Sequence, residues 1–209
     1  QNNKIQQIGV IAHEFGHALG APDFYDTDYT TNGEFNGTGI WDLLANGAWS
    51  GDYGSRPTGI NGWQKWVWGW TEPTLLDEST TVSDMPSATD EAVAYKMETG
   101  TPGEYFFMEN RQNTKGFDKS LPGHGLIIYH VDENLIKNKV YTNDINAAYP
   151  QGIYTVCSDA NAEPSNEPGS YGWVNSEYAP FPGEKNHTEF SDNTTPSAKA
   201  RNGRFSYRS

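Results

Sequence analysis

The chain has 209 residues and a formal net charge of −13, with 14 Lys and Arg against 27 Asp and Glu. This length suffices for one large domain, or a domain and a half, with a buried core. The scarcity of basic residues argues against nucleic acid or an anionic membrane as a partner, and no apolar run reaches the roughly 18 residues of a membrane span.

The most informative stretch lies near the start, where residues 13–23 read His-Glu-Phe-Gly-His-Ala-Leu-Gly-Ala-Pro-Asp. On a helix, a residue four positions further on is displaced by about 40° around the axis and roughly 6 Å along it. His13 and His17 therefore project from one face and can share a zinc ion. Glu14 lies one step round from His13, where its carboxylate can take a proton from a metal-bound water. The pattern predicts a zinc hydrolase with Glu14 as general base.

The motif is expected to lie on a helix, because apolar residues recur at helical intervals around it and Gly20 followed by Pro22 is a stop signal. The alternative is an ordinary amphipathic helix with two unrelated histidines. The recurring apolar residues are Ile5, Ile8, Val10, Ile11, Phe15, Ala18 and Leu19.

A catalytic zinc site usually has three protein ligands, so the histidines need a partner. Asp23 is the nearest candidate, since Gly20 can adopt the positive φ that turns the chain off the helix and Pro22 prevents the helix from resuming. Other side chains remain open as third ligand, and they are Asp26, Asp28, Glu34, His124, His130 and His187.

With this motif the chain resembles the secreted bacterial metallopeptidases related to immune inhibitor A, whose pattern is His-Glu-x-x-His-x-x-Gly-x-x-Asp. The resemblance implies that His13, His17 and Asp23 bind zinc, that Glu14 is the base, and that the substrates are proteins or peptides. It also implies a secreted or cell-surface location in a bacterium. Further segments that resemble this family are Asp23-Phe-Tyr-Asp26, Trp41-Asp-Leu-Leu-Ala-Asn-Gly47, Tyr105-Phe-Phe-Met-Glu-Asn-Arg111, Gly125-Leu-Ile-Ile-Tyr-His-Val-Asp132, Pro182-Gly183 and Phe190-Ser-Asp-Asn-Thr-Thr-Pro196.

The implied fold is α+β, with metzincin-like catalytic helices followed by an antiparallel β subdomain, and with an N-terminal sheet that precedes Gln1 in the full protein. Residues 1–71 are expected to form the catalytic zinc-site half of a metalloprotease domain, and residues 72–209 a β-rich subdomain with an irregular C-terminal segment. Metzincins place a methionine in a turn below the metal. The matching position here is Leu44, whose similar volume can preserve an apolar floor.

Residues 24–58 form a long loop rich in Gly, Asn, Asp and aromatic residues, and such loops are usually functional or bind ions. Asp26, Asp28, Asn32 and Glu34 offer neighbouring oxygen ligands for a calcium ion, although their spacing is not that of an EF-hand. A solvated acidic turn is the alternative.

A second helix is predicted over residues 57–69. It places three tryptophans, Trp63, Trp66 and Trp70, at helical spacing. Packing into the core is favoured over the stacking of sugars, because aromatic stripes with this period usually face inward.

From about residue 72 the pattern changes to short strands, predicted at residues 92–97, 104–111, 125–131 and 152–157. Residues 158–209 are expected to be irregular coil. The single cysteine, Cys157, excludes an internal disulfide and is expected to be a buried apolar residue. The polar members of the strands, Glu109, Arg111, His130 and Asp132, are interpreted as structural ion pairs in preference to cleft residues.

Together these features predict a zinc-dependent endopeptidase. Stabilisation of the oxyanion needs a further donor, for which Tyr25 and Tyr53 are both available. The rival hypothesis is a non-catalytic, metal-stabilised module that binds a surface protein or glycan. Because Glu14 has no role in such a module, its presence favours the enzyme.

Overall fold

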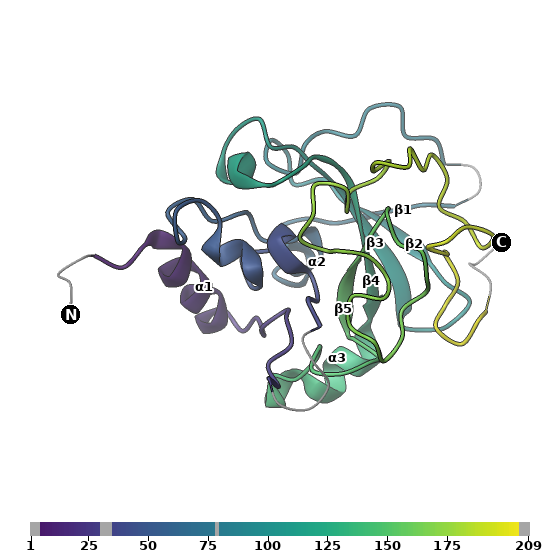
Figure 1. The fold of residues 1–209 in the computed structure, drawn as a ribbon, viewed down its shortest axis with the longest axis horizontal. Helices are drawn as coiled ribbons and strands as arrows, with labels where there is room; N and C mark the ends of the chain where they lie inside the picture. Colours follow the sequence, from purple (N-terminus) through teal and green to yellow (C-terminus); the bar gives the residue numbers. More distant parts are fainter. Residues whose placement is uncertain (1–4, 30–34, 78–79, 205–209) are drawn as a thin grey trace.

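The computed structural model describes residues 5–29, 35–77 and 80–204. These residues adopt a mixed α/β fold, in which a five-stranded sheet is accompanied by short helices (Figure 1). The α-helices are α1 (Ile8–Ala18), α2 (Gly62–Val67) and α3 (Glu133–Lys139), and the 3-10 helices are η1 (Gly39–Trp41), η2 (Asn46–Trp49), η3 (Phe117–Ser120) and η4 (Val140–Thr142). The strands are β1 (Thr74–Leu75), β2 (Tyr95–Glu98), β3 (Glu104–Arg111), β4 (Gly125–Asp132) and β5 (Ile153–Val156).

The strands follow one another across the sheet in chain order. Strands β2 to β5 pair antiparallel, as expected, but β1 pairs parallel with β2, so the sheet is not wholly antiparallel. The difference arises because the 19 residues between β1 and β2 return the chain to the same end of the sheet before β2 begins.

Strand β3 is buried on both faces of the sheet. Because successive side chains of a strand point to opposite faces, Tyr105 and Phe107 enter one apolar core while Phe106 and Met108 enter another. The first core also contains Trp41 and Leu44, which precede residue 71. Residues from both sides of the predicted boundary thus share one core, and the division into two units stays a prediction.

Helix α1 lies at one end of the molecule, beside η2 and away from the sheet (Figure 1). It packs through Gly9 and Gly16, its two buried residues. A Cβ atom on Gly9 would collide with the carbonyl oxygen of Ala48. Glycine at this position therefore allows the helix backbone to approach the loop closely enough for Gly9 N to donate a 2.9 Å hydrogen bond to the carbonyl oxygen of Gly54.

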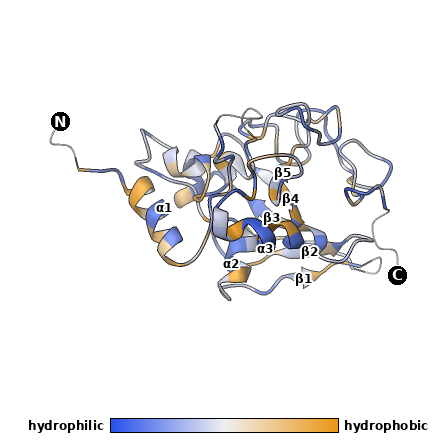
Figure 2. Cartoon of the chain, turned by 90° about the horizontal axis from the view of Figure 1, so that it is seen from below, coloured by the Kyte–Doolittle hydropathy of each residue, from blue (hydrophilic) through white to orange (hydrophobic). Residues whose placement is uncertain are grey.

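The apolar residues of α1 form an exposed stripe on its outer side (Figure 2). The stripe comprises Ile8, Ile11, Phe15 and the adjoining Leu19, which are 51%, 50%, 64% and 43% exposed. Contiguous apolar surface of this kind is typical of faces that another layer covers. The N-terminal sheet that the family resemblance implies stays a prediction.

Helix α2 is shorter than the helix predicted over residues 57–69. The Asn61 side chain accepts a 2.7 Å hydrogen bond from Gln64 N and so begins the helix at Gly62, after Pro57 and Gly59. Trp63 lies in the core, as expected. Trp70 is instead 55% exposed and packs on Trp68, so its predicted inward orientation is wrong. The reason is that α2 ends at Val67, before it reaches Trp70.

The remaining element predictions are largely confirmed. Strands β3, β4 and β5 match their predicted ranges to within one residue, and β2 is shifted toward its C-terminal end. Residues 158–204 contain no helix or strand, and Cys157 is buried. Strand β1 and helix α3 were not predicted.

Candidate metal centre

Helix α1 and the turn that follows it bring three ligand-type atoms together. His13 Nε2 lies 3.1 Å from His17 Nε2, and Asp23 Oδ1 lies 3.0 Å and 3.3 Å from these two nitrogens. Gly20, with a φ of 90°, reverses the chain after the helix as its sequence position predicted. Within the described ranges, no other group of three His, Cys, Asp or Glu side chains lies close enough to hold a metal ion.

The far nitrogens of both imidazoles are held by backbone carbonyls. His13 Nδ1 donates to the carbonyl oxygen of Leu43 at 2.9 Å, and His17 Nδ1 donates to that of Ala21 at 2.8 Å. A carbonyl can only accept, so each Nδ1 carries the hydrogen and each neutral ring leaves an unprotonated Nε2. Such outer partners orient metal-binding histidines and fix their tautomer.

Three acceptor atoms therefore face one another without a proton between them. Asp23 Oδ1 is buried and accepts no hydrogen bond of good geometry. This arrangement is repulsive unless a cation lies among the three atoms. Zn–N distances of about 2.0–2.1 Å place the ligands of a tetrahedral site about 3.3 Å apart, close to the 3.0–3.3 Å separations observed. The donor set thus fits zinc.

The other oxygen of Asp23 is held by a residue far along the chain. Asn143 Nδ2 donates to Asp23 Oδ2 at 2.7 Å, and Asp23 N donates to Asn143 Oδ1 at 2.8 Å. Burial alone would raise the pKa of Asp23, but the pKa lies below its ordinary value, and the hydrogen bond that Asn143 donates contributes to this lowering. The carboxylate is therefore in the deprotonated form that a ligand requires. Sequence reasoning did not identify Asn143, because no local motif links it to the histidines.

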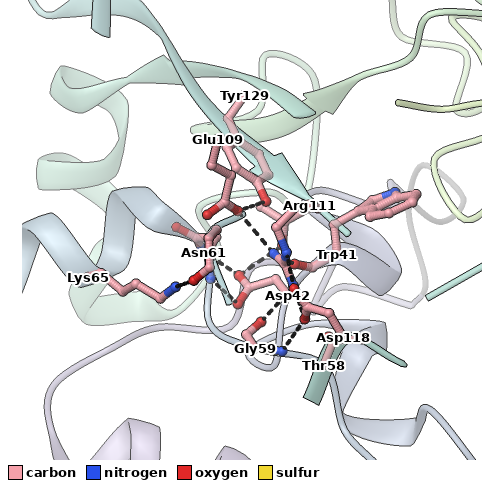
Figure 3. Close-up of polar contacts among 12 residues, drawn as sticks. Trp41, Asp42, Thr58, Gly59, Asn61, Lys65, Glu109, Arg111, Asp118 and Tyr129 are labelled. Atoms are coloured by element: carbon pink, nitrogen blue, oxygen red, sulfur yellow. Dashed lines mark hydrogen bonds and ion pairs between the residues drawn. The ribbon is translucent and has the colours of Figure 1, made fainter. Parts of the chain in front are cut away.

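The turn that carries Leu43 is fixed by a buried carboxylate. Asp42 accepts hydrogen bonds from Thr38 Oγ1 at 3.1 Å and from Leu44 N at 3.2 Å. Asn61 adds two more, from its backbone N at 3.2 Å and its Nδ2 at 2.5 Å (Figure 3). These bonds hold the backbone of residues 42–44, and with it the carbonyl oxygen that orients His13.

Glu14 lies beside the cluster without belonging to it. It is exposed and, with His13 and Tyr25, lines a pocket of about 310 Å³. Glu14 therefore borders a space next to His13 that has room for a substrate and a water molecule. This is the placement that a general base requires.

The two tyrosines proposed as oxyanion donors differ in their position relative to the pocket. The Tyr25 ring stacks on His13 with centroids 6.5 Å apart, and burial followed by the charge of Asp23 raises the Tyr25 pKa, which keeps the hydroxyl protonated. Tyr53 is 84% exposed and does not line the pocket. Tyr25 is the one that lies at the site.

The loop proposed to bind calcium is only partly described. Asp26 is 2% exposed, and its carboxylate accepts hydrogen bonds from Asp28 N at 2.8 Å and from Phe35 N at 3.3 Å. The buried Asp26 carboxylate thus stabilises the loop by hydrogen bonds to its backbone. Asn32 and Glu34 lie outside the described residues, and the calcium site stays a prediction.

Glu109 and Arg111 of β3 lie in a buried network of polar contacts (Figure 3). Arg111 Nη1 lies 3.0 Å from Glu109 Oε1, and Arg111 also binds both oxygens of Asp118 with bonds of 2.5 and 2.7 Å. Tyr129 donates a 2.8 Å hydrogen bond to Glu109. The interpretation of Glu109 and Arg111 as structural agrees with this geometry.

The second polar pair also has structural partners. His130 Nε2 lies 2.8 Å from Glu104 Oε1, and Asp132 caps α3 through a 2.9 Å hydrogen bond from Leu135 N. His130, His124 and His187 do not join the metal-ligand group of the described chain, so Asp23 is the residue that lies with the two helix histidines.

Comparison with known proteins connects this cluster to a peptidase family. Residues 3–70 match the model described as immune inhibitor A peptidase M6, catalytic domain. The predicted resemblance is therefore confirmed over the segment that contains the three ligand candidates and Glu14.

Two similar proteins carry names of the same kind. The pre-pro-metalloprotease PrtV of Vibrio cholerae serotype O1 is 47% identical over 58 residues, which are 27% of this chain and 6% of that protein. Immune inhibitor A of Bacillus thuringiensis subsp. alesti is 47% identical over 55 residues, which are 26% of this chain and 8% of that protein. No solved structure matches, and no described helix is long and apolar enough to cross a membrane.

Proposed function

We propose that this chain, whose residues 3–70 match the immune inhibitor A peptidase family, carries the catalytic centre of a zinc-dependent endopeptidase. The observation that carries the proposal is the convergence of His13 Nε2, His17 Nε2 and Asp23 Oδ1 beside Glu14. These three atoms are the proposed zinc ligands. The match to the family supports a peptidase, and the donor set supports zinc.

When bound, zinc would supply Lewis-acid polarisation of the scissile carbonyl and lower the pKa of the attacking water. Glu14 takes the proton from that water and delivers it to the leaving amine. Its position one residue after His13 gives it reach to the water without making it a ligand. The Tyr25 hydroxyl, in the same pocket, donates to the oxygen of the carbonyl as negative charge develops there.

The pocket that Glu14 lines is where a protein or peptide substrate is proposed to bind. Its described walls include the aromatic residues Tyr25, Phe35 and Trp49, and no Lys or Arg is among the described lining residues. A secreted or cell-surface location in a bacterium completes the proposal, and the bacterial origin of both similar proteins is consistent with it. Detection of the protein in the culture medium or on the cell surface tests the location.

The decisive experiment compares Glu14→Gln with wild type in the full-length protein. Casein hydrolysis should fall by a factor of roughly 10²–10⁴ while the zinc content remains that of the wild type. Glu72→Gln, at an exposed residue outside the pocket, is the matched control and should retain full activity. Full activity in Glu14→Gln would contradict the proposed base.

The rival function, a non-catalytic metal-stabilised module that binds a surface protein or glycan, predicts a different result. The wild-type protein would then be inert on casein and gelatin with and without a chelator, while still binding its ligand. Chelator-sensitive hydrolysis by the wild type excludes this alternative.

A further inference from the structure

The third ligand candidate is held by a residue 120 positions later in the chain. Asn143 follows η4, beyond α3, and the segment from Asp23 to Asp28 runs toward this part of the molecule (Figure 1). Its side-chain amide binds both the backbone and the side chain of Asp23, through Asp23 N at 2.8 Å and Asp23 Oδ2 at 2.7 Å.

The backbone of Asn143 suits this double contact. Its φ of 54° and ψ of 35° are left-handed, a conformation that Asn adopts more readily than most residues. Its carbonyl oxygen accepts a 2.6 Å hydrogen bond from Thr27 Oγ1. The backbone of Asn143 is therefore held beside the segment that carries Asp23.

The contact leaves one oxygen of Asp23 for the cluster. Because Oδ2 accepts from Asn143, Oδ1 points at the two Nε2 atoms. A carboxylate without this partner can rotate about its Cβ–Cγ bond and lose the single-oxygen geometry. The histidines have equivalent supports in the carbonyl oxygens of Leu43 and Ala21, so each of the three ligand candidates has one outer hydrogen bond.

We propose that Asn143 is a positioning residue of the metal centre, which acts through Asp23 by fixing the oxygen that faces the metal. The inference rests on the proposed zinc site. Outer partners of metal ligands typically contribute a factor of about 10–100 in metal affinity.

The test uses Asn143→Gly in the full-length protein, because glycine keeps the left-handed backbone and removes only the amide. Zinc affinity, measured by competition with a chromogenic chelator, should fall by about 10–100-fold. The matched control is Asn186→Gly, at an exposed asparagine with a φ of 53°, which should leave zinc affinity unchanged.

A double-mutant cycle distinguishes positioning from a general loss of structure. In an Asp23→Ala background, Asn143→Gly should produce no further loss of zinc affinity, since the residue through which it acts is gone. An equal loss in both backgrounds, or an unchanged affinity in Asn143→Gly alone, would overturn the proposal. Absence of zinc binding by the wild type would refute the proposed function instead.

The near-isosteric Asn143→Asp provides a second readout if the glycine variant does not fold. It retains an acceptor for Asp23 N but replaces the Nδ2 donor with an oxygen that faces Asp23 Oδ2. With cobalt in place of zinc, the visible absorption spectrum should differ from that of wild type, because the carboxylate is no longer held in the same orientation. An identical spectrum would count against the positioning role.

Discussion

Leu44 packs its side chain against the backbone of Gly16, the residue directly before the second histidine of the motif. A Cβ atom on Gly16 would lie 2.9 Å from Leu44 Cδ1, and Leu44 itself is fully buried. Leu44 therefore fills the space beside Gly16 of α1. Its correspondence to the methionine of metzincins stays a prediction.

Leu44→Met should be tolerated, with a loss of stability below about 1.5 kcal/mol and with zinc content retained, because the two side chains have similar volumes. Leu44→Ala should cost about 2–5 kcal/mol, because it leaves a cavity under Gly16. Urea denaturation of the two variants measures both values. Equal stability of Leu44→Ala and wild type would show that the contact does not support the helix.

Arg111→Met should destabilise the protein by about 3–5 kcal/mol, because it leaves the buried carboxylates of Glu109 and Asp118 without their cation. The matched control is Lys115→Met, which breaks an exposed ion pair with Asp90 and should change stability by no more than about 1 kcal/mol. Urea midpoints of both variants test the difference. Similar midpoints for the two variants would contradict the structural role of Arg111.

Asp118→Asn should change the acid sensitivity of the fold. Burial raises the pKa of Asp118, but the Arg111 guanidinium outweighs it and the pKa lies below its ordinary value of 3.8. A depressed carboxyl pKa gives stability that is present above the ordinary value and is lost as the pH falls through the folded-state pKa. Wild type should therefore be the more stable protein at neutral pH, and its advantage should shrink below pH 3.8.

Urea midpoints of wild type and Asp118→Asn at about pH 7 and about pH 3 provide the measurement. A stability difference that is the same at both pH values would contradict the lowered pKa.

Tyr25→Phe should lower kcat on a peptide substrate by about 10²-fold with little change in KM, because the hydroxyl is used only as charge develops on the carbonyl oxygen. Zinc content should be unaffected. Tyr53→Phe is the matched control, since Tyr53 is exposed and outside the pocket. Loss of activity in Tyr53→Phe but not in Tyr25→Phe would reverse the assignment.

Local sequence signals predicted the parts of the site that lie close together in the chain. His13, Glu14 and His17 follow from helical spacing, and the return of Asp23 follows from Gly20 and Pro22, because all of these residues lie within one short segment of the chain. Strands β3 to β5 could also be predicted from the sequence, since runs of β-branched and aromatic residues indicate strands.

The residues that hold the ligand candidates in place through hydrogen bonds could not be predicted from the sequence in the same way. Asn143, Leu43 and Asp42 act through contacts that only the tertiary structure brings together, and an isolated Asn in a polar stretch carries no local signal. The length of α2 was overestimated for a related reason. The hydrogen bond to the Asn61 side chain determines where that helix begins, and the spacing of the apolar residues alone does not indicate this start.

The bond between Asp23 and Asn143 also bears on biosynthesis. During translation, the three ligand candidates leave the ribosome well before Asn143 is made, 120 residues after Asp23. A nascent chain at that stage has two histidines and a carboxylate without its amide partner. The metal affinity of the folded protein is therefore expected only after the segment that carries Asn143 has emerged and folded.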